Sequence, residues 1–230
     1  MNTNSKLRVA LFFGGVSSEH DVSCVSASAW LRALGQEPCA DKYEVFPVGI
    51  TKDGRWLACR PTPEAMADGS WELGDCTPCV LSPDRKDHGI WLLKDGRAEL
   101  VHIDICAPVM HGKNGEDGTI QGLFELARIP YVGCGVLGSA VCMDKAVANA
   151  LMDAAGVPHC KWVAASRADL ELNGPVVLDG IEAKLGYPIF VKPANAGSSV
   201  GISKAADRAA LEKGVEIALR EDDKVVFEEF

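Results

Sequence analysis

Long apolar runs, basic clusters and low-complexity segments are missing from this 230-residue sequence. No stretch is apolar over the roughly 20 residues that a membrane-spanning helix needs, and no basic-then-apolar leader is present, so we expect neither a membrane span nor a signal peptide. Aspartate and glutamate number 32 against 23 lysines and arginines, a net charge of −9. Nucleic-acid binding through a basic face is therefore not expected. These absences predict a cytoplasmic protein.

The nine cysteines form no even, regularly spaced framework. Four lie in apolar segments and are predicted to be buried small hydrophobic residues of a reducing compartment: Cys24, Cys106, Cys134 and Cys142. Cys76 and Cys79 form a Cys-x-x-Cys pair, which is typical of half a zinc site or of a redox pair. No second pair follows and only His88 is near, so a plain loop is favoured over both.

The first part of the chain alternates predicted strands and helices. Residues 7–13 form an apolar run that indicates a buried strand, and Ser18 is a candidate N-cap for a helix that runs to about Gly35. Residues 43–50 and 103–110 are further strands. This order predicts a mainly parallel sheet with helices on both faces. Ligands bind beyond the carboxyl ends of such strands, where the loops "GGVSSEHD", "HGKNGEDG" and "GCGVLG" lie.

Residues 51–100 interrupt this pattern. The segments "TKDGRW" and "LLKDGRAEL" each contain Asp-Gly, the strongest short hairpin signal. We therefore predict an insertion of hairpins and loops. After it, "YVGCG" is predicted to be a short strand.

The pattern changes near Met143. A helix over 143–157, three strands ("HCKWVAA", "YPIFVKP" and "SSVGISK"), an amphipathic helix over 206–221 and a last strand "KVVFEEF" predict a separate α+β lobe. Because the sequence stops within a predicted strand, we expect the chain to be a fragment of a longer protein.

The stretch "IFVKPANAGSSVGISK" carries the first chemical signal. Lys192 lies on an apolar strand, where an unpaired buried ammonium is costly, so it should have a partner. The loop after it contains Gly197, Ser198, Ser199 and Gly201, which suit phosphate, although no Walker motif is present. From spacing alone, phosphate binding and a hairpin turn beside a solvent-reaching lysine are equally favoured.

Other charged residues permit two interpretations each. Lys145 lies near a helix start and would welcome an anion there, yet its position alone favours an ordinary exposed lysine. Glu228 and Glu229 alternate on a strand, so one must face inward or line a cleft. Glu19 in a first helical turn either serves the helix dipole or binds an ammonium. His111 at a strand end is more often structural than catalytic.

Three segments together resemble one family: "FGGVSSEHDVS", "MHGKNGEDGTIQGLFELARIPYVGCGVLGSAVCMDK" and "YPIFVKPANAGSSVGISK". They are similar to the D-alanine–D-alanine ligases of the ATP-grasp superfamily, over residues 7–230. "FPVGITKDGRW" and "HGKNGEDG" resemble the vancomycin-resistance branch that makes D-Ala–D-Ser ends. The resemblance implies an α/β fold, with a Rossmann-like pre-ATP-grasp domain at 1–142 and an incomplete ATP-grasp central subdomain at 143–230.

The resemblance also implies a reaction in peptidoglycan precursor synthesis. ATP phosphorylates the carboxylate of D-alanine, and a second D-amino or D-hydroxy acid attacks the acyl phosphate. A tetrahedral intermediate then loses phosphate. The protein mainly positions the reactants and stabilises charge.

By position in the family motifs, the resemblance implies a role for each candidate residue. Lys145 and Lys192 would hold ATP phosphates, under a mobile loop with Gly197, Ser198, Ser199 and Gly201. Glu228, Glu229 and Phe230 would contact adenine. Glu19 would bind the ammonium of the first D-alanine with His111 nearby, and Glu19 and Ser198 would belong to the catalytic machinery. The resemblance thereby favours phosphate binding for Lys192.

The family's Mg²⁺ carboxylates, catalytic arginine and second-substrate loop are expected beyond Phe230, so no metal ligand is assigned here. We therefore expect this chain alone to be inactive and to bind ATP weakly, and we expect a homodimer. D-Ala, D-Ser and D-lactate stay open as second substrates. A non-catalytic module that binds nucleotide or D-alanine is the alternative, and "GGVSSEHD" with "HGKNGEDG" argues against another ATP-grasp enzyme.

Overall fold

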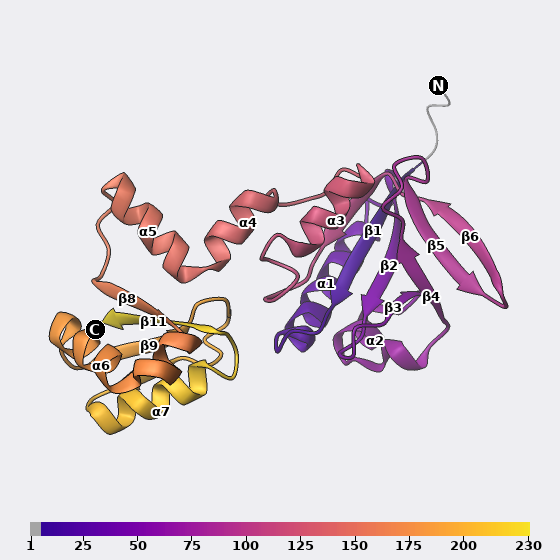
Figure 1. The fold of residues 1–230 in the computed structure, drawn as a ribbon. Coiled ribbons are helices and arrows are strands. Elements are labelled where there is room, and N and C mark those ends of the chain that lie inside the picture. The colour runs from indigo at the N-terminus through magenta and orange to yellow at the C-terminus, as the bar shows by residue number, and fades with distance from the viewer. Residues whose placement is uncertain (1–5) are drawn as a thin grey trace. The chain divides into compact units, whose positions relative to one another are not determined.

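The computed structural model describes residues 6–230, which form two compact units, one ending at Gly138 and the other spanning Ser139–Phe230 (Figure 1). The domain boundary predicted after residue 142 falls at the end of helix α4 (Val136–Met143) and stays a prediction. None of the helices in the described residues is both long and apolar enough to span a membrane.

The first unit is built on a seven-stranded sheet of order β6-β5-β4-β3-β2-β1-β7. Its strands are β1 (Leu7–Gly14), β2 (Tyr43–Ile50), β3 (Trp56–Cys59), β4 (Cys76–Leu81), β5 (Gly89–Lys94), β6 (Arg97–His102) and β7 (Ile105–Pro108). Strand β1 pairs in parallel with β2 and β7, whereas β3 to β6 pair antiparallel. The α/β class is confirmed, but the sheet is mixed rather than mainly parallel.

The predicted hairpins account for the antiparallel half. Asp95 and Gly96 take φ of 53° and 72°, which matches the twist of a two-residue hairpin turn between β5 and β6. The other Asp-Gly pair lies between β2 and β3. Residues 51–100 therefore extend the sheet and do not form a separate insertion. They also contain the short helices α2 (Pro63–Ala67) and η1 (Ser70–Leu73).

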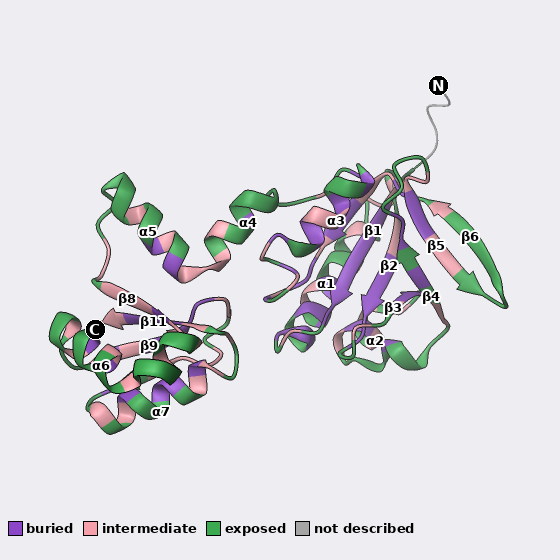
Figure 2. Ribbon diagram, in the orientation of Figure 1, coloured by how far each residue is buried: buried purple, intermediate pink, exposed green. Residues whose placement is uncertain are grey.

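Strand β1 divides the core of this unit by simple alternation. Ala10 and Phe12 belong to a cluster that includes residues of α3 (Thr119–Ala127). Leu11 and Phe13 belong to a second cluster that includes residues of α1 (His20–Leu34). Figure 2 shows β1 buried along nearly its whole length. The strand is thus fixed from both sides, and its carboxyl end is held rigidly.

Two local predictions in this unit are wrong. Helix α1 is capped by Glu19 and not by Ser18, and the Glu19 side chain makes no capping hydrogen bond. Its predicted end at Gly35 is confirmed. The segment "YVGCG" contributes only one bridge, between Tyr131 and Cys106, because the chain turns into α4 immediately afterwards.

The cysteine predictions hold in part. Cys24 and Cys106 are buried, whereas Cys134 and Cys142 are exposed. Cys134 lies in a loop, and α4, which carries Cys142, buries only Ser139. Cys76 and Cys79 lie in strand β4 rather than a loop, and they pack into the clusters on opposite faces of the sheet.

The second unit has a four-stranded antiparallel sheet of order β10-β9-β11-β8. Its elements are α5 (Lys145–Ala155), β8 (Trp162–Ser166), α6 (Arg167–Leu185), β9 (Ile189–Pro193), β10 (Ser203–Ala205), α7 (Arg208–Ala218) and β11 (Lys224–Glu229). Residues of α6 and α7 cover one face, packing on Ile189, Val191 and Phe227. Helix α5 contacts the other face through Ala146.

Most of the second unit follows its sequence patterns. Helix α5 begins after the Asp144 cap and ends at Gly156 in the left-handed conformation, as expected of a C-cap glycine. Helix α6 is not foreseen, because Asn173 and Pro175 interrupt its apolar spacing. Strand β10 is shorter than predicted, because the residues before it form turns with positive φ at Ser198, Ser199 and Gly201.

Candidate functional site

The face of the second sheet that α6 and α7 leave uncovered carries the charged residues. Along β9, Ile189 and Val191 point into the core, so the alternate residues Phe190 and Lys192 lie on the opposite face. In the register of the sheet, Phe190 pairs with Glu228 and Lys192 pairs with Val226. The uncovered face therefore presents Lys192 and Glu228 on neighbouring strands.

Lys192 has the partner that its apolar strand requires. Its Nζ donates to a carboxylate oxygen of Glu228, and the two side chains retain only 22% and 13% exposure. The other Glu228 oxygen lies 3.5 Å from the Asn149 amide of α5. Glu229 instead pairs with Lys161 at 3.1 Å and accepts the Lys161 backbone N–H at 2.8 Å. As predicted from strand alternation, one of the two glutamates lies on the candidate site and the other does not.

Lys145 is not the exposed helix lysine that its position favours. It is the first residue of α5 and turns back onto the segment after β9, where its Nζ donates to the Ala196 carbonyl at 2.5 Å and lies 3.4 Å from the Ala194 carbonyl. Burial lowers the pKa of Lys145, and the charge of nearby Lys192 lowers it further. Lys145 thus faces the segment between β9 and the loop, where the charge of Lys192 acts on it.

The loop over residues 197–201 begins directly beside these lysines. Ser198 and Ser199 are exposed and take φ of 47° and 62°, while Gly201 takes 71°. Two turn hydrogen bonds shape it, from Val200 N–H to the Gly197 carbonyl at 3.0 Å and from Ile202 N–H to the Ser199 carbonyl at 3.3 Å. A loop of small residues with hydroxyl donors beside two lysines suits an anionic oxygen-rich group.

Aromatic rings lie at the other end of the same face. The rings of Phe190 and Phe230 have centroids 5.7 Å apart. The Nζ atoms of Lys192 and Lys204 lie 5.4 Å and 3.4 Å from the centroids of Phe190 and Phe230, respectively. A planar, electron-rich group therefore has apolar partners here, next to the cationic end of the face.

The first unit carries a separate polar cluster at the carboxyl end of β1. A Cβ atom at Gly14 would lie 2.3 Å from the Ile50 carbonyl oxygen, so only glycine fits at its φ of 80°. The Ser23 hydroxyl accepts the Gly14 N–H at 2.8 Å and donates to the Val109 carbonyl at 2.5 Å. These contacts tie helix α1 to the end of β1 and to the segment that follows β7.

Glu19 and His111 are brought together in this cluster. Glu19 is only 6% exposed, and Gly112, next to His111, is packed against its carboxylate. The Ser17 hydroxyl donates to the His111 carbonyl at 2.7 Å, and Ser26 Oγ is hydrogen bonded to His111 Nε2 at 2.9 Å. The His111 imidazole also lies 4.0 Å from the Glu116 carboxylate. The cluster thus contains a buried carboxylate that can accept an ammonium group and an imidazole held by Ser26.

Sequence reasoning missed several residues of these clusters. Asn149 follows Lys145 by four residues and so shares its helix face, and Phe190 precedes Lys192 by two and so shares its strand face. Each of these two spacings is visible in the sequence and could have identified the residue as a neighbour of the lysine. Ser26 contacts His111 across 85 positions, and no local pattern indicates this contact.

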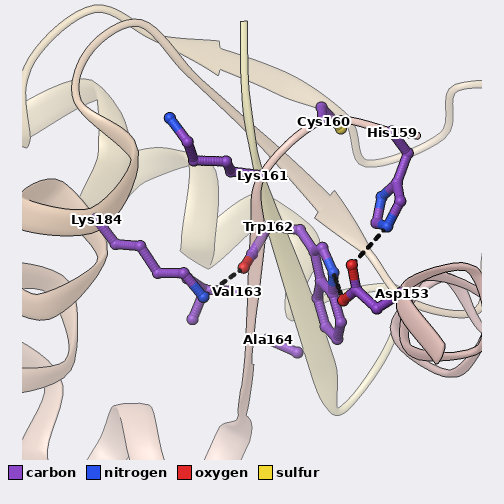
Figure 3. Close-up of a pocket in the computed structure, with 8 residues that line it drawn as sticks. All are labelled: Asp153, His159, Cys160, Lys161, Trp162, Val163, Ala164 and Lys184. Carbon is purple, nitrogen blue, oxygen red and sulfur yellow. Dashed lines mark hydrogen bonds and ion pairs between the residues drawn. The ribbon is translucent and has the colours of Figure 1, made fainter. Parts of the chain in front are cut away.

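A hollow beside edge strand β8 contains a further polar cluster (Figure 3). The Asp153 carboxylate is bonded to His159 Nε2 and to Trp162 Nε1, each at 2.9 Å, and Lys184 Nζ donates to the Trp162 carbonyl at 3.1 Å. These hydrogen bonds fasten the connection between α5 and β8, although the buried Nδ1 of His159 has no partner among the described residues. We assign them a structural role.

Comparison with known proteins finds family models that match both parts of the chain. Residues 8–134 match the family model described as the D-Ala–D-Ala ligase N-terminus, and residues 151–230 match the D-Ala–D-Ala ligase C-terminus. The first match contains Glu19 and His111, and the second contains Lys192, the 197–201 loop and Glu228.

Individual relatives agree. A D-alanine–D-alanine ligase of Caldicellulosiruptor bescii is 45% identical over 98% of this chain and 60% of its own length, and a putative D-alanine–D-lactate ligase of Streptomyces coelicolor is 45% identical over 97% and 60%. The crystal structure of the VanG D-Ala:D-Ser ligase from Enterococcus faecalis matches with a TM-score of 0.85 and 38% identity, over 98% of this chain and 63% of that one. The chain thus spans about 60% of the length of these relatives. Because it matches both the N-terminal and the C-terminal family models, the chain belongs to the D-alanine–D-alanine ligase family.

Proposed function

We propose that this chain provides the first-substrate site and a large part of the nucleotide site of an ATP-dependent ligase, which joins D-alanine to a second D-amino or D-hydroxy acid for peptidoglycan precursors. The observation that carries the proposal is the pairing of Lys192 with Glu228 on the sheet face opposite α6 and α7, beside Lys145 and a Gly/Ser loop. Family membership supplies the reaction class.

The residues of the second unit fit a nucleoside triphosphate. Lys145 and Lys192 are close enough for one charge to lower the other's pKa, so a polyphosphate would relieve their repulsion. The loop with Gly197, Ser198, Ser199 and Gly201 would add N–H and hydroxyl donors to the phosphates. Phe190 and Phe230 would contact adenine, and Glu228 and the backbone at Glu229 would accept from it. ATP supplies the phosphate that activates the D-alanine carboxylate.

The residues of the first unit fit the other substrate. The buried Glu19 carboxylate would hold the ammonium of the first D-alanine, and His111 would contact the same molecule. Ser198 is proposed to belong to the catalytic machinery. Magnesium is proposed to accompany ATP, and we assign it no ligand among the described residues.

We also propose candidates for the second substrate, a location and an oligomeric state. Relatives are named for D-alanine, D-lactate and D-serine products, so all three acids are candidates. We propose that the protein acts in the cytoplasm as a homodimer.

Product analysis tests the proposal. The protein expressed from its complete reading frame is incubated with ATP, Mg²⁺, D-alanine and either D-serine or D-lactate, and products are identified by mass spectrometry alongside phosphate release. Phosphate release that depends on D-alanine, with a D-alanyl product, is the expected result. ATP or D-alanine binding without turnover would instead identify a non-catalytic binding module.

A further inference from the structure

The segment that joins β9 to the 197–201 loop is held by hydrogen bonds to several other elements. We call Ala194–Ala196 the stem of the loop. Ala194 is fully buried, its N–H donates to the Lys224 carbonyl at 2.9 Å, and its carbonyl accepts the Lys145 N–H at 3.1 Å. The stem is therefore tied to both β11 and α5, although it lies outside every strand.

Asn195 is held by a single carboxylate. Its backbone N–H and its side-chain amide both donate to one oxygen of Asp222, at 2.8 Å and 2.9 Å. The other Asp222 oxygen accepts the N–H of Asp223 at 2.8 Å. Asp222 thus has both oxygens engaged, and it fixes the backbone direction and the side chain of Asn195 together.

Lys145 holds the stem from the opposite side. Its Nζ donates to the Ala196 carbonyl and lies near the Ala194 carbonyl, so the carbonyls on both sides of Asn195 face a lysine while the Asn195 donors face Asp222. The N–H groups of Ala194 and Asn195 therefore bond to Lys224 and Asp222, whereas the carbonyls of Ala194 and Ala196 face Lys145. Loss of Asp222 would leave the stem held only through its carbonyls and the Ala194 N–H.

The same turn also contacts the far end of the loop. A Cβ atom at Gly201 would lie 2.9 Å from the Cγ atom of Glu221 and 3.2 Å from the ring of Pro193. Glu221 and Asp222 are adjacent in the turn between α7 and β11. Both ends of the 197–201 loop therefore rest against one turn, while Ser198 and Ser199 at its tip are exposed.

We propose that Asp222 is a positioning residue, which anchors the stem through Asn195 and so confines the adjustment to a bound phosphate to residues 197–201. The proposal rests on the proposed function for its role in ATP binding. A fixed stem shortens the segment that must be ordered on binding. It also keeps the Lys145 ammonium group beside the start of the loop. Both effects reduce the entropic cost of binding.

Substitution of Asp222 tests the anchor. The variants are Asp222→Ala, Asp222→Asn, whose amide oxygen still accepts from Asn195, and the control Asp223→Ala, which keeps the N–H that Asp222 accepts. The first measurement is amide hydrogen exchange without nucleotide, together with thermal unfolding. We expect exchange over 194–201 to rise at least about tenfold in Asp222→Ala, as expected when a charge-assisted hydrogen bond is lost. Asp222→Asn should recover most of the protection. Asp223→Ala loses an ion pair with Arg167 but no contact with the stem, so its exchange over 194–201 should match wild type.

The second measurement separates nucleotide from amino-acid binding. In the protein expressed from its complete reading frame, Asp222→Ala should raise KM for ATP about tenfold and leave KM for D-alanine within about twofold. Unchanged exchange in Asp222→Ala overturns the anchor, and faster exchange with an unchanged KM for ATP overturns its role. If wild type shows no D-alanine-dependent turnover, the proposed function fails, and the exchange result still decides whether Asp222 anchors the stem.

Discussion

Lys192 and Glu228 project from neighbouring antiparallel strands onto the same face of the second sheet, and their side chains form an ion pair that is mostly shielded from water. Such a pair contributes little net stability, because desolvation of two charges offsets most of their attraction. Its value is that it places an ammonium group on an otherwise apolar strand. The ion pair is therefore better suited to binding a ligand than to stabilising the fold.

Replacement of Lys192 should therefore affect ATP use far more than folding. In the protein expressed from its complete reading frame, Lys192→Ala removes a charge that we propose binds phosphate, and we expect kcat/KM for ATP to fall about ten-thousandfold, equivalent to about 5 kcal/mol. The free energy of unfolding should fall by only about 1–3 kcal/mol, less than for a fully buried pair, because Lys192 and Glu228 both keep some contact with water. Steady-state kinetics and urea unfolding measure the two effects. Lys213→Ala, on the exposed face of α7, is the control. Parallel losses of stability and activity would favour a structural role for Lys192.

Ser26 should matter for D-alanine because it orients His111. Ser26→Ala removes the hydrogen bond to His111 Nε2, so the imidazole keeps only its longer contact with Glu116, at 4.0 Å, and its orientation is less fixed. We expect kcat/KM for D-alanine to fall about tenfold, with KM for ATP unchanged and a stability loss of about 1 kcal/mol. Ser18→Ala, at an exposed position just before α1, should behave as wild type. Equal effects on both substrates would show that Ser26 acts only through the fold.

Local sequence patterns predict the structural features that depend on interactions between residues close together in the sequence. The Asp-Gly turns, the Gly156 cap and the phase of β9 follow from backbone conformation and strand alternation. The exposure of Cys134 and Cys142 could not be predicted, because it depends on which helix faces receive tertiary partners. The same holds for the antiparallel half of the first sheet, where the hairpin strands pair beyond their own turns.

The candidate site shows the same division. Lys192, Glu228 and the 197–201 loop are visible in the sequence, because each is an exception to its surroundings. Asn195 and Asp222 are ordinary polar residues in turns, 27 positions apart, and their contact arises only when β11 is placed beside β9. Residues that position others are therefore harder to predict than residues that bind directly.

Gly14 should tolerate no side chain. Its φ of 80° is unfavourable for other residues, and a Cβ atom would lie 2.3 Å from the Ile50 carbonyl oxygen. We expect Gly14→Ala to lower the free energy of unfolding by about 2–4 kcal/mol, measured by urea unfolding, because the end of β1 must shift. Gly69→Ala is the matched control, since φ is also 80° there but no atom lies within 4 Å of the added Cβ. A similar loss of unfolding free energy in both variants would mean that the positive φ causes the effect and that the contact with the Ile50 carbonyl does not contribute.

The lowered pKa of Lys145 predicts a pH dependence with a definite sign. Burial and then the charge of Lys192 lower this pKa below its usual 10.5. Between the lowered value and 10.5, the folded chain has released the Lys145 proton while the unfolded chain retains it. The unfolded state then binds more protons, so this group makes the free energy of unfolding rise with pH across that window.

Urea unfolding of wild type and Lys145→Met over a series of pH values isolates this contribution, because the other lysines titrate in both proteins. The difference in unfolding free energy should move in favour of wild type as pH rises through the window. In contrast, Lys213→Met replaces an exposed lysine, and its curve should run parallel to that of wild type. A Lys145→Met curve that also runs parallel would mean that neither burial nor Lys192 disfavours the charged form of Lys145. In that case relief of repulsion between the two lysines would no longer support phosphate binding at this face.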